Sequence, residues 1–106
     1  MSRSIRLIYR NQMGRSKHNY NWPPITKRSA VVITAAEWKA GNNPGDSSGR
    51  PVLGDADIYV TNIGSHDPEG GTGGVEFCLH VDWHKPLHVQ VTIIVLDPVE
   101  NYLVVG

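Results

Sequence analysis

The clearest pattern in the chain is an alternation of apolar and polar positions in residues 74–97, GVEFCLHVDWHKPLHVQVTIIVLD. A repeat of two is typical of a β-strand with one buried face. The alternation stops at Lys85-Pro86 and then resumes, so the segment predicts a central β-hairpin. A loop of three or five residues pairs apolar with apolar side chains, for example Val81 with Val91, whereas a slip of one residue would exchange the faces.

The rest of the chain predicts short strands separated by long turns. Further strands are expected at residues 4–10, 29–39, 56–63 and 102–105. Irregular loops rich in glycine, proline or asparagine are expected at residues 11–26, 40–55 and 64–73. Residues 29–39 are largely apolar at both sets of alternating positions, which predicts a strand buried on both faces.

No window of about 11 or more residues has apolar residues at helical spacing, although residues 35–40 could form a single helical turn. A chain of 106 residues has the length of one domain with one core. The sequence therefore predicts a single all-β domain over residues 1–106, a small antiparallel β-sandwich or barrel of about six strands.

The charges of the chain are divided unevenly, although the net charge is zero. Residues 1–28 contain seven Lys and Arg and no acid, whereas residues 29–106 contain three Lys and Arg and ten acids, so the two parts carry +7 and −7. We expect this basic N-terminal segment to dock on acidic surface of the chain itself or of a second copy. Nucleic acid or another polyanion is the alternative partner.

The sequence contains no apolar run long enough for a membrane span and no apolar region of a signal peptide. Cys78 is the single cysteine, so an internal disulfide is impossible. These features predict a cytoplasmic protein with no membrane partner.

The histidines of the expected hairpin suggest a metal site. His80, Asp82 and His84 share one face of the first arm, and the register places His88 opposite His84. Cross-strand neighbours have Cβ atoms about 5 Å apart, close enough for imidazoles and a carboxylate to ligate zinc or another divalent metal. The spacing is not a specific motif, so a cupin-like metalloprotein or enzyme is an alternative, and no required cofactor is expected.

Two further groups of residues are candidates for ligand binding. Tyr20 and Trp22 could stack on a sugar or a base, although such aromatic residues more commonly cover a core. Asp46 and Asp67 belong to long acidic loops that could offer oxygen ligands to calcium if the two loops meet at one end of the sandwich. The sequence Gly-Asp-Ser-Ser-Gly at residues 45–49 fits the pattern G-x-S-x-G but lacks the strand before it and the helix after it that a nucleophile elbow requires.

The second face of the expected hairpin has an apolar end formed by Cys78, Ile94 and Leu96. A solvated face does not usually carry such a group, so the N-terminal segment or another subunit should cover it. The sequence shows no specific catalytic motif. We therefore expect a non-enzymatic binding or assembly module that forms a homo-oligomer, with a carbohydrate- or polyanion-binding module as a further alternative.

Overall fold

The computed structural model describes residues 2–42, 48–68 and 72–106, and this part of the chain folds into β-strands with no helix. The expected all-β class is confirmed. The seven strands are β1 (Arg3–Gln12), β2 (Gly14–Asn21), β3 (Ser29–Lys39), β4 (Arg50–Val52), β5 (Asp57–His66), β6 (Gly74–Asp82) and β7 (Leu87–Pro98).

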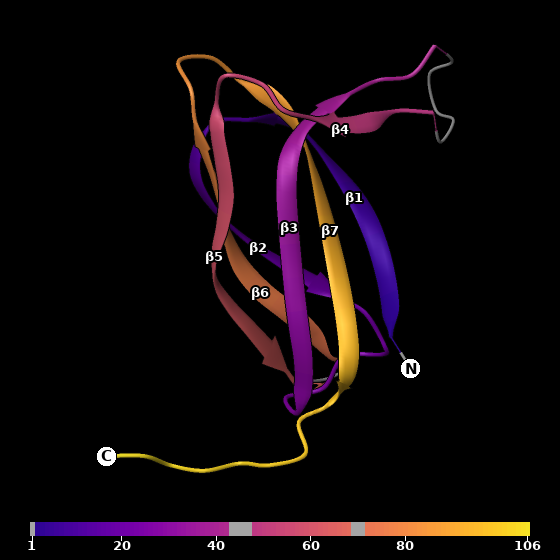
Figure 1. Cartoon of the computed structure of the whole chain (residues 1–106), viewed down its shortest axis with the longest axis vertical. Helices are drawn as coiled ribbons and strands as arrows, with labels where there is room; N and C mark the ends of the chain where they lie inside the picture. Colours follow the sequence, from indigo (N-terminus) through magenta and orange to yellow (C-terminus); the bar gives the residue numbers. More distant parts are fainter. Residues whose placement is uncertain (1, 43–47, 69–71) are drawn as a thin grey trace.

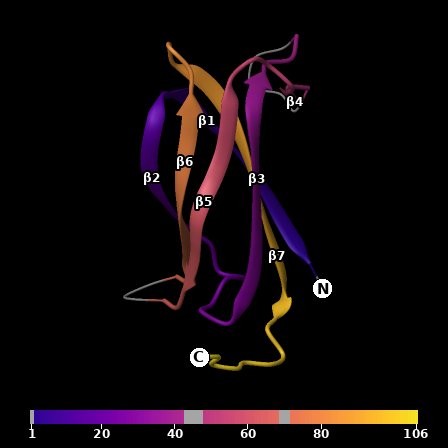
Figure 2. The same cartoon turned by 60° about the vertical axis from the view of Figure 1, so that its left-hand side comes forward.

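The strands form two antiparallel sheets that pack face to face (Figures 1 and 2). Sheet A has the order β1-β7-β3-β4, and sheet B has the order β2-β6-β5. On one side of the sandwich β3 of sheet A lies beside β5 of sheet B. We call the end where β3 begins and β7 ends the foot of the sandwich.

The core lies between the sheets and is built from the alternating apolar positions of β6 and β7. Val75, Leu79, Val89, Val91 and Ile93 are completely buried. Phe77, Val81 and Val95 complete the two rows with at most 5% exposure. Each apolar side chain removed from water contributes about 1.5–3 kcal/mol, so these rows dominate the stability of the fold.

The predicted hairpin over residues 74–97 is wrong in its pairing. β6 pairs with β2 and β5, whereas β7 pairs with β1 and β3, so the two strands face each other across the core instead of lying side by side. The chain crosses from one sheet to the other at Trp83–Pro86. The matching of apolar with apolar positions does not distinguish two strands that lie side by side from two strands that face each other across a core.

The first two strands also cross from sheet A to sheet B, beside the crossing between β6 and β7. β1 pairs with β7 from Arg3↔Val95 to Gln12↔Leu87, and β2 then pairs with β6 from Gly14↔Val81 onward. The bend between them contains Asn11 with φ 56° and Gly14 with φ 70°, in the left-handed region that glycine and asparagine tolerate. The prediction that residues 11–26 are irregular is therefore wrong for most of its length.

Other predicted elements differ in detail. Strand β3 has the predicted bounds, but it is not buried on both faces, because Val32 and Thr34 point outward and are exposed. The expected loop at residues 40–55 contains the short strand β4, which pairs with the end of β3. Residues 102–105 form no strand and lie exposed beyond the foot of the sandwich (Figure 1). Within the described residues, no helix has the length and apolarity needed to cross a membrane.

Candidate functional site

The outer face of sheet B carries two of the predicted metal ligands, His80 and Asp82. Cys78, His80 and Asp82 project from this side of β6. Lys17 and Arg15 on β2 lie opposite Cys78 and His80, respectively. Glu76 projects from the same side of β6, so the face combines two cations, two carboxylates, an imidazole and a thiol.

His80 is held by two neighbours on β5. Its ring stacks on Tyr59 with centroids 4.5 Å apart and an interplanar angle of 6°. Its Nε2 lies 2.7 Å from the hydroxyl oxygen of Thr61. These contacts fix the orientation of the imidazole within a group of side chains rather than leaving it free in solvent.

The structure does not gather the four predicted metal ligands. His88 is on β7 in sheet A, where its Nδ1 accepts a hydrogen bond of 3.1 Å from the backbone N–H of Asn11. His84 lies in the corner between the sheets with its ring 4.6 Å from that of Trp83. The predicted pairing of His84 with His88 is wrong because it required the hairpin. Among the described residues, no three His, Cys, Asp or Glu side chains are grouped to hold a metal ion.

Two shallow hollows lie on the sheet B face and share Arg15 as a wall. One of about 300 Å³ is lined by Arg15, Lys17, His18, Asn62, Glu76, Phe77 and Cys78. The other, of about 190 Å³, is lined by Gly14, Arg15, Tyr59, His80, Val81 and Asp82. Asn62, with φ 56°, belongs to an irregularity between Thr61 and Gly64 that interrupts the β5–β6 register. Such bulges redirect side chains, here beside the larger hollow.

Cys78 is 5% exposed even though it points to the outer face. The guanidinium of Arg15 covers it, and Nη2 donates to the sulfur at 3.2 Å. The expectation that the N-terminal segment or another subunit covers the apolar group is therefore met at Cys78 by β2 of the same chain.

His18 and Tyr9 form a partly buried pair between the sheets. Their ring centroids are 4.6 Å apart, and the His18 ring also stacks on Phe77 at 5.5 Å. Burial lowers the pKa of His18 below the ordinary value for histidine. Burial also raises the pKa of Tyr9, with a smaller contribution from Tyr20.

The predicted stacking residues lie near the foot of the sandwich. Tyr20 and Trp22 are half-buried and pack against the core. Arg3 lies over the Trp22 ring at 5.8 Å. The backbone N–H of Trp22 donates to the carbonyl of Gly73 at 2.7 Å.

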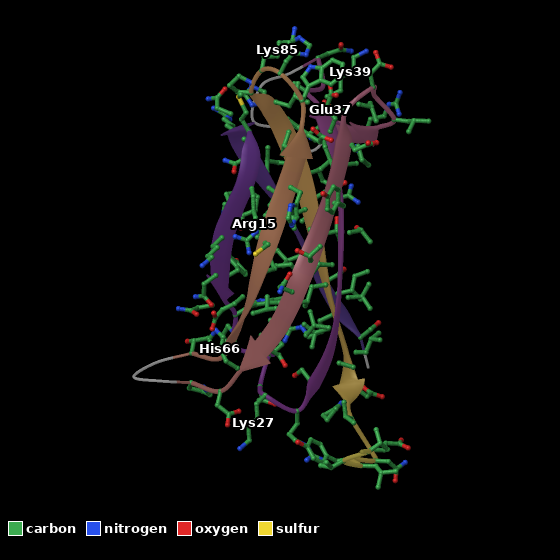
Figure 3. All side chains as sticks on the ribbon, turned by 90° about the vertical axis from the view of Figure 1, so that its left-hand side faces the viewer. Arg15, Lys27, Glu37, Lys39, His66 and Lys85 are labelled. Atoms are coloured by element: carbon green, nitrogen blue, oxygen red, sulfur yellow. The ribbon has the colours of Figure 1, made fainter. Side chains whose placement is uncertain are left out.

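The described residues of the two acidic loops do not meet at one end. β5 begins at the end of the sandwich where β3 finishes, and it finishes at the foot, so the segments before and after β5 lie at opposite ends (Figure 2). Asp67 accepts a hydrogen bond from the backbone N–H of Lys27 at 2.9 Å and lies 3.8 Å from its ammonium group. Lys27 and His66 mark this end of the molecule in Figure 3. Asp46 lies outside the described residues.

The outer face of sheet A carries an apolar group that the sequence identified only in part. Ile94 is half-buried and Leu96 is 42% exposed. Val32 on β3 lies directly beside Ile94 and is 44% exposed. We call Val32, Ile94 and Leu96 the sheet A patch. Val32 was missed because the apolar alternate positions of residues 29–39 were assigned to a strand buried on both faces.

Cys78 does not lie on the same face as Ile94 and Leu96, because β6 and β7 belong to different sheets. The predicted interface of these three residues therefore has no common surface. Farther from the foot, the sheet A face carries polar side chains, with Arg6 Nε donating to the Thr92 hydroxyl at 3.1 Å and Gln90 also donating to that oxygen. One further apolar residue, Ile8, lies beside Gln90 on this face and is 37% exposed.

In comparisons with known proteins, no family model, curated protein or solved structure matches this chain.

Proposed function

We propose that this chain is a non-enzymatic binding and assembly module whose copies associate through the outer face of sheet A. The observation that carries the proposal is the sheet A patch, in which Val32 and Leu96 are 44% and 42% exposed beside Ile94. Antiparallel sheets commonly keep their solvent face polar, so an apolar group there is a candidate interface.

The surroundings of the patch support an interface between copies. The patch lies at the foot end of sheet A, and the exposed chain after β7 continues its apolar character through Val99, which is 42% exposed. Because the same surface is present on every copy, two copies can bury it against itself around a two-fold axis. Polar residues around Arg6 and Thr92 would form the rim.

Sedimentation velocity on the full chain over a range of micromolar concentrations tests the proposal. We expect an oligomer that dissociates when Val32→Lys or Leu96→Lys places a charge in the contact. Leu53→Lys is the matched control, because Leu53 is fully exposed and lies outside the patch. Circular dichroism should show the same fold in all three variants. A wild-type chain that stays monomeric, or an oligomer that survives both patch variants, would overturn the proposal.

A further inference from the structure

The chain after β7 carries the most exposed apolar residues near the foot of the sandwich. Tyr102, Leu103, Val104 and Val105 have relative exposures of 76%, 82%, 80% and 80%. The segment is held at its base, where the backbone N–H of Val99 donates to the carbonyl of Arg28 at 2.9 Å. The Arg28 guanidinium also lies 5.6 Å from the centre of the Tyr102 ring.

We call residues Tyr102–Val105 the C-terminal arm. Four consecutive apolar residues in water are unfavourable, because removing apolar surface from water is the main stabilising contribution in folding and association. Tyrosine and valine also prefer strands over other conformations, and the arm contains no Gly, Pro or charge. The arm is therefore a strand sequence that lacks a sheet.

The free edge of β1 is a suitable acceptor. In sheet A, β1 pairs with β7 alone, so along the described strand the backbone groups of its other edge have no strand partner. Ile5 and Leu7 point from β1 toward the core and are only half-buried. An added strand would cover their remaining exposed surface with its own inward side chains.

The other edges fit an apolar strand less well. The inward positions of β2 beyond the corner are Ser16, His18 and Tyr20, so two of the three are polar. β4 has three residues, and β5 lies beside β3. Charge also favours β1, which carries Arg3, Arg6 and Arg10 and no acid, whereas Glu100 precedes the arm.

The arm of a chain does not lie near its own β1. The segment leaves the foot of β7 beneath β3 toward the side of β5, whereas β1 flanks β7 on the opposite side, as both views of the ribbon show (Figures 1 and 2). A second copy can present its β1 edge without this constraint. Reciprocal exchange between two copies would give a closed dimer.

We propose that the C-terminal arm of one copy adds as a strand to the free edge of β1 in a second copy. The inference rests on the proposed self-association and names the segment and the edge that make it specific. In the same dimer, the sheet A patches of the two copies would pack against each other. Each arm would extend sheet A of the other copy by one strand.

A peptide spanning residues 97–106 tests the contact directly. The receptor is the full chain carrying Leu103→Asp and Val105→Asp. These substitutions lie outside the two sheets and prevent the receptor's own arm from occupying the β1 edge of another copy. We expect saturable binding, with slower hydrogen exchange at the amides of β1 and not of β2. A peptide with the same two Asp substitutions should bind at least about tenfold more weakly, because charged residues replace two buried apolar ones.

Backbone methylation separates strand addition from simple apolar contact. Alternate N–H groups of a strand point to the same side, so N-methylation at residues 102 and 104 and N-methylation at residues 103 and 105 should differ. One pattern should abolish binding, and the other should leave it nearly unchanged. Equal binding by both methylated peptides, no binding of the parent peptide, or exchange protection at another edge would overturn the inference.

Sedimentation of the arm variant separates this inference from the proposed function. An oligomer that survives Leu103→Asp and Val105→Asp but dissociates with Leu96→Lys, without peptide binding, would overturn the arm contact and retain the patch. Peptide binding at β1 together with weaker self-association of the arm variant supports both. A monomeric wild-type chain that does not bind the peptide would overturn both.

Discussion

Thr61 and His80 lie diagonally across the β5–β6 ladder, with the threonine hydroxyl oxygen 2.7 Å from Nε2 of the imidazole. The same imidazole stacks on Tyr59, so the ring is held both at its edge and on its face. Neither contact was visible in the sequence, because residues 59–61 and 80 meet only through strand pairing.

Thr61→Val should therefore lower the free energy of unfolding by about 1 kcal/mol, since it removes one partly buried hydrogen bond while keeping the shape of the side chain. Thr61→Ser keeps the hydroxyl and is the matched control. Urea denaturation measures the difference. Equal stability of the valine and serine variants would mean that the contact with His80 contributes nothing.

Gly73 marks a close approach of two backbone segments. A Cβ added at Gly73 would overlap the carbonyl oxygen of Ile25, and it would lie 3.1 Å from the carbonyl oxygen of His66. Gly73→Ala should thus cost about 1–3 kcal/mol, because backbone atoms cannot move aside as a flexible side chain can. Gly64→Ala is the matched control, since a Cβ there meets no atom within 4 Å. Thermal unfolding that ranks Gly64→Ala as the less stable variant would contradict this contact.

His18 should make the stability of the fold sensitive to acid. Burial lowers its pKa in the folded state below the ordinary histidine value of 6.5, so the unfolded chain binds the proton more tightly. The unfavourable contribution is absent at higher pH, where both states are neutral. It develops as the pH falls below the pKa of the unfolded state and is complete below the pKa of the folded state.

An NMR titration of the His18 ring measures this effect at the residue itself. We expect a midpoint below 6.5. His18→Phe keeps a ring beside Tyr9 and Phe77 and should reduce the loss of stability in acid. A midpoint at or above the ordinary histidine value would show that burial does not govern this group.

Arg15 should control access to the single thiol. Its guanidinium donates to the sulfur of Cys78 at 3.2 Å, and Cys78 is 5% exposed. Arg15→Ala should increase the rate at which an aromatic disulfide reagent modifies Cys78 in the native state, because it removes the side chain that covers the sulfur. Lys17→Ala is the control from the same strand. If Lys17→Ala increases the modification rate of Cys78 more than Arg15→Ala does, Arg15 is not the side chain that shields the sulfur.

The alternation of apolar residues identified the buried faces correctly. Val75, Phe77, Leu79 and Val81 on β6, and the matching row on β7, are the core. This information is local, since successive side chains of any strand point to opposite sides whatever the strand pairs with. The bounds of β3 and the absence of helix in the described residues followed from the same local signals.

The pairing of the strands was not local and could not be obtained in this way. Two apolar faces match each other equally well side by side in one sheet or face to face across a core, and the alternation does not distinguish these arrangements. The assignment of His84, His88, Cys78 and Ile94 to one face failed for this reason.

β2 is a second case, because its strand state depends on its partner. Residues 14–21, GRSKHNYN, have little apolar character, and their inward positions include Ser16 and His18. Backbone hydrogen bonds to β6 make this segment a strand. The sequence by itself determined the strand class and the core rows. The tertiary structure alone decided the sheet of each strand, and with it the surfaces that meet solvent, because those hydrogen bonds join segments far apart along the chain.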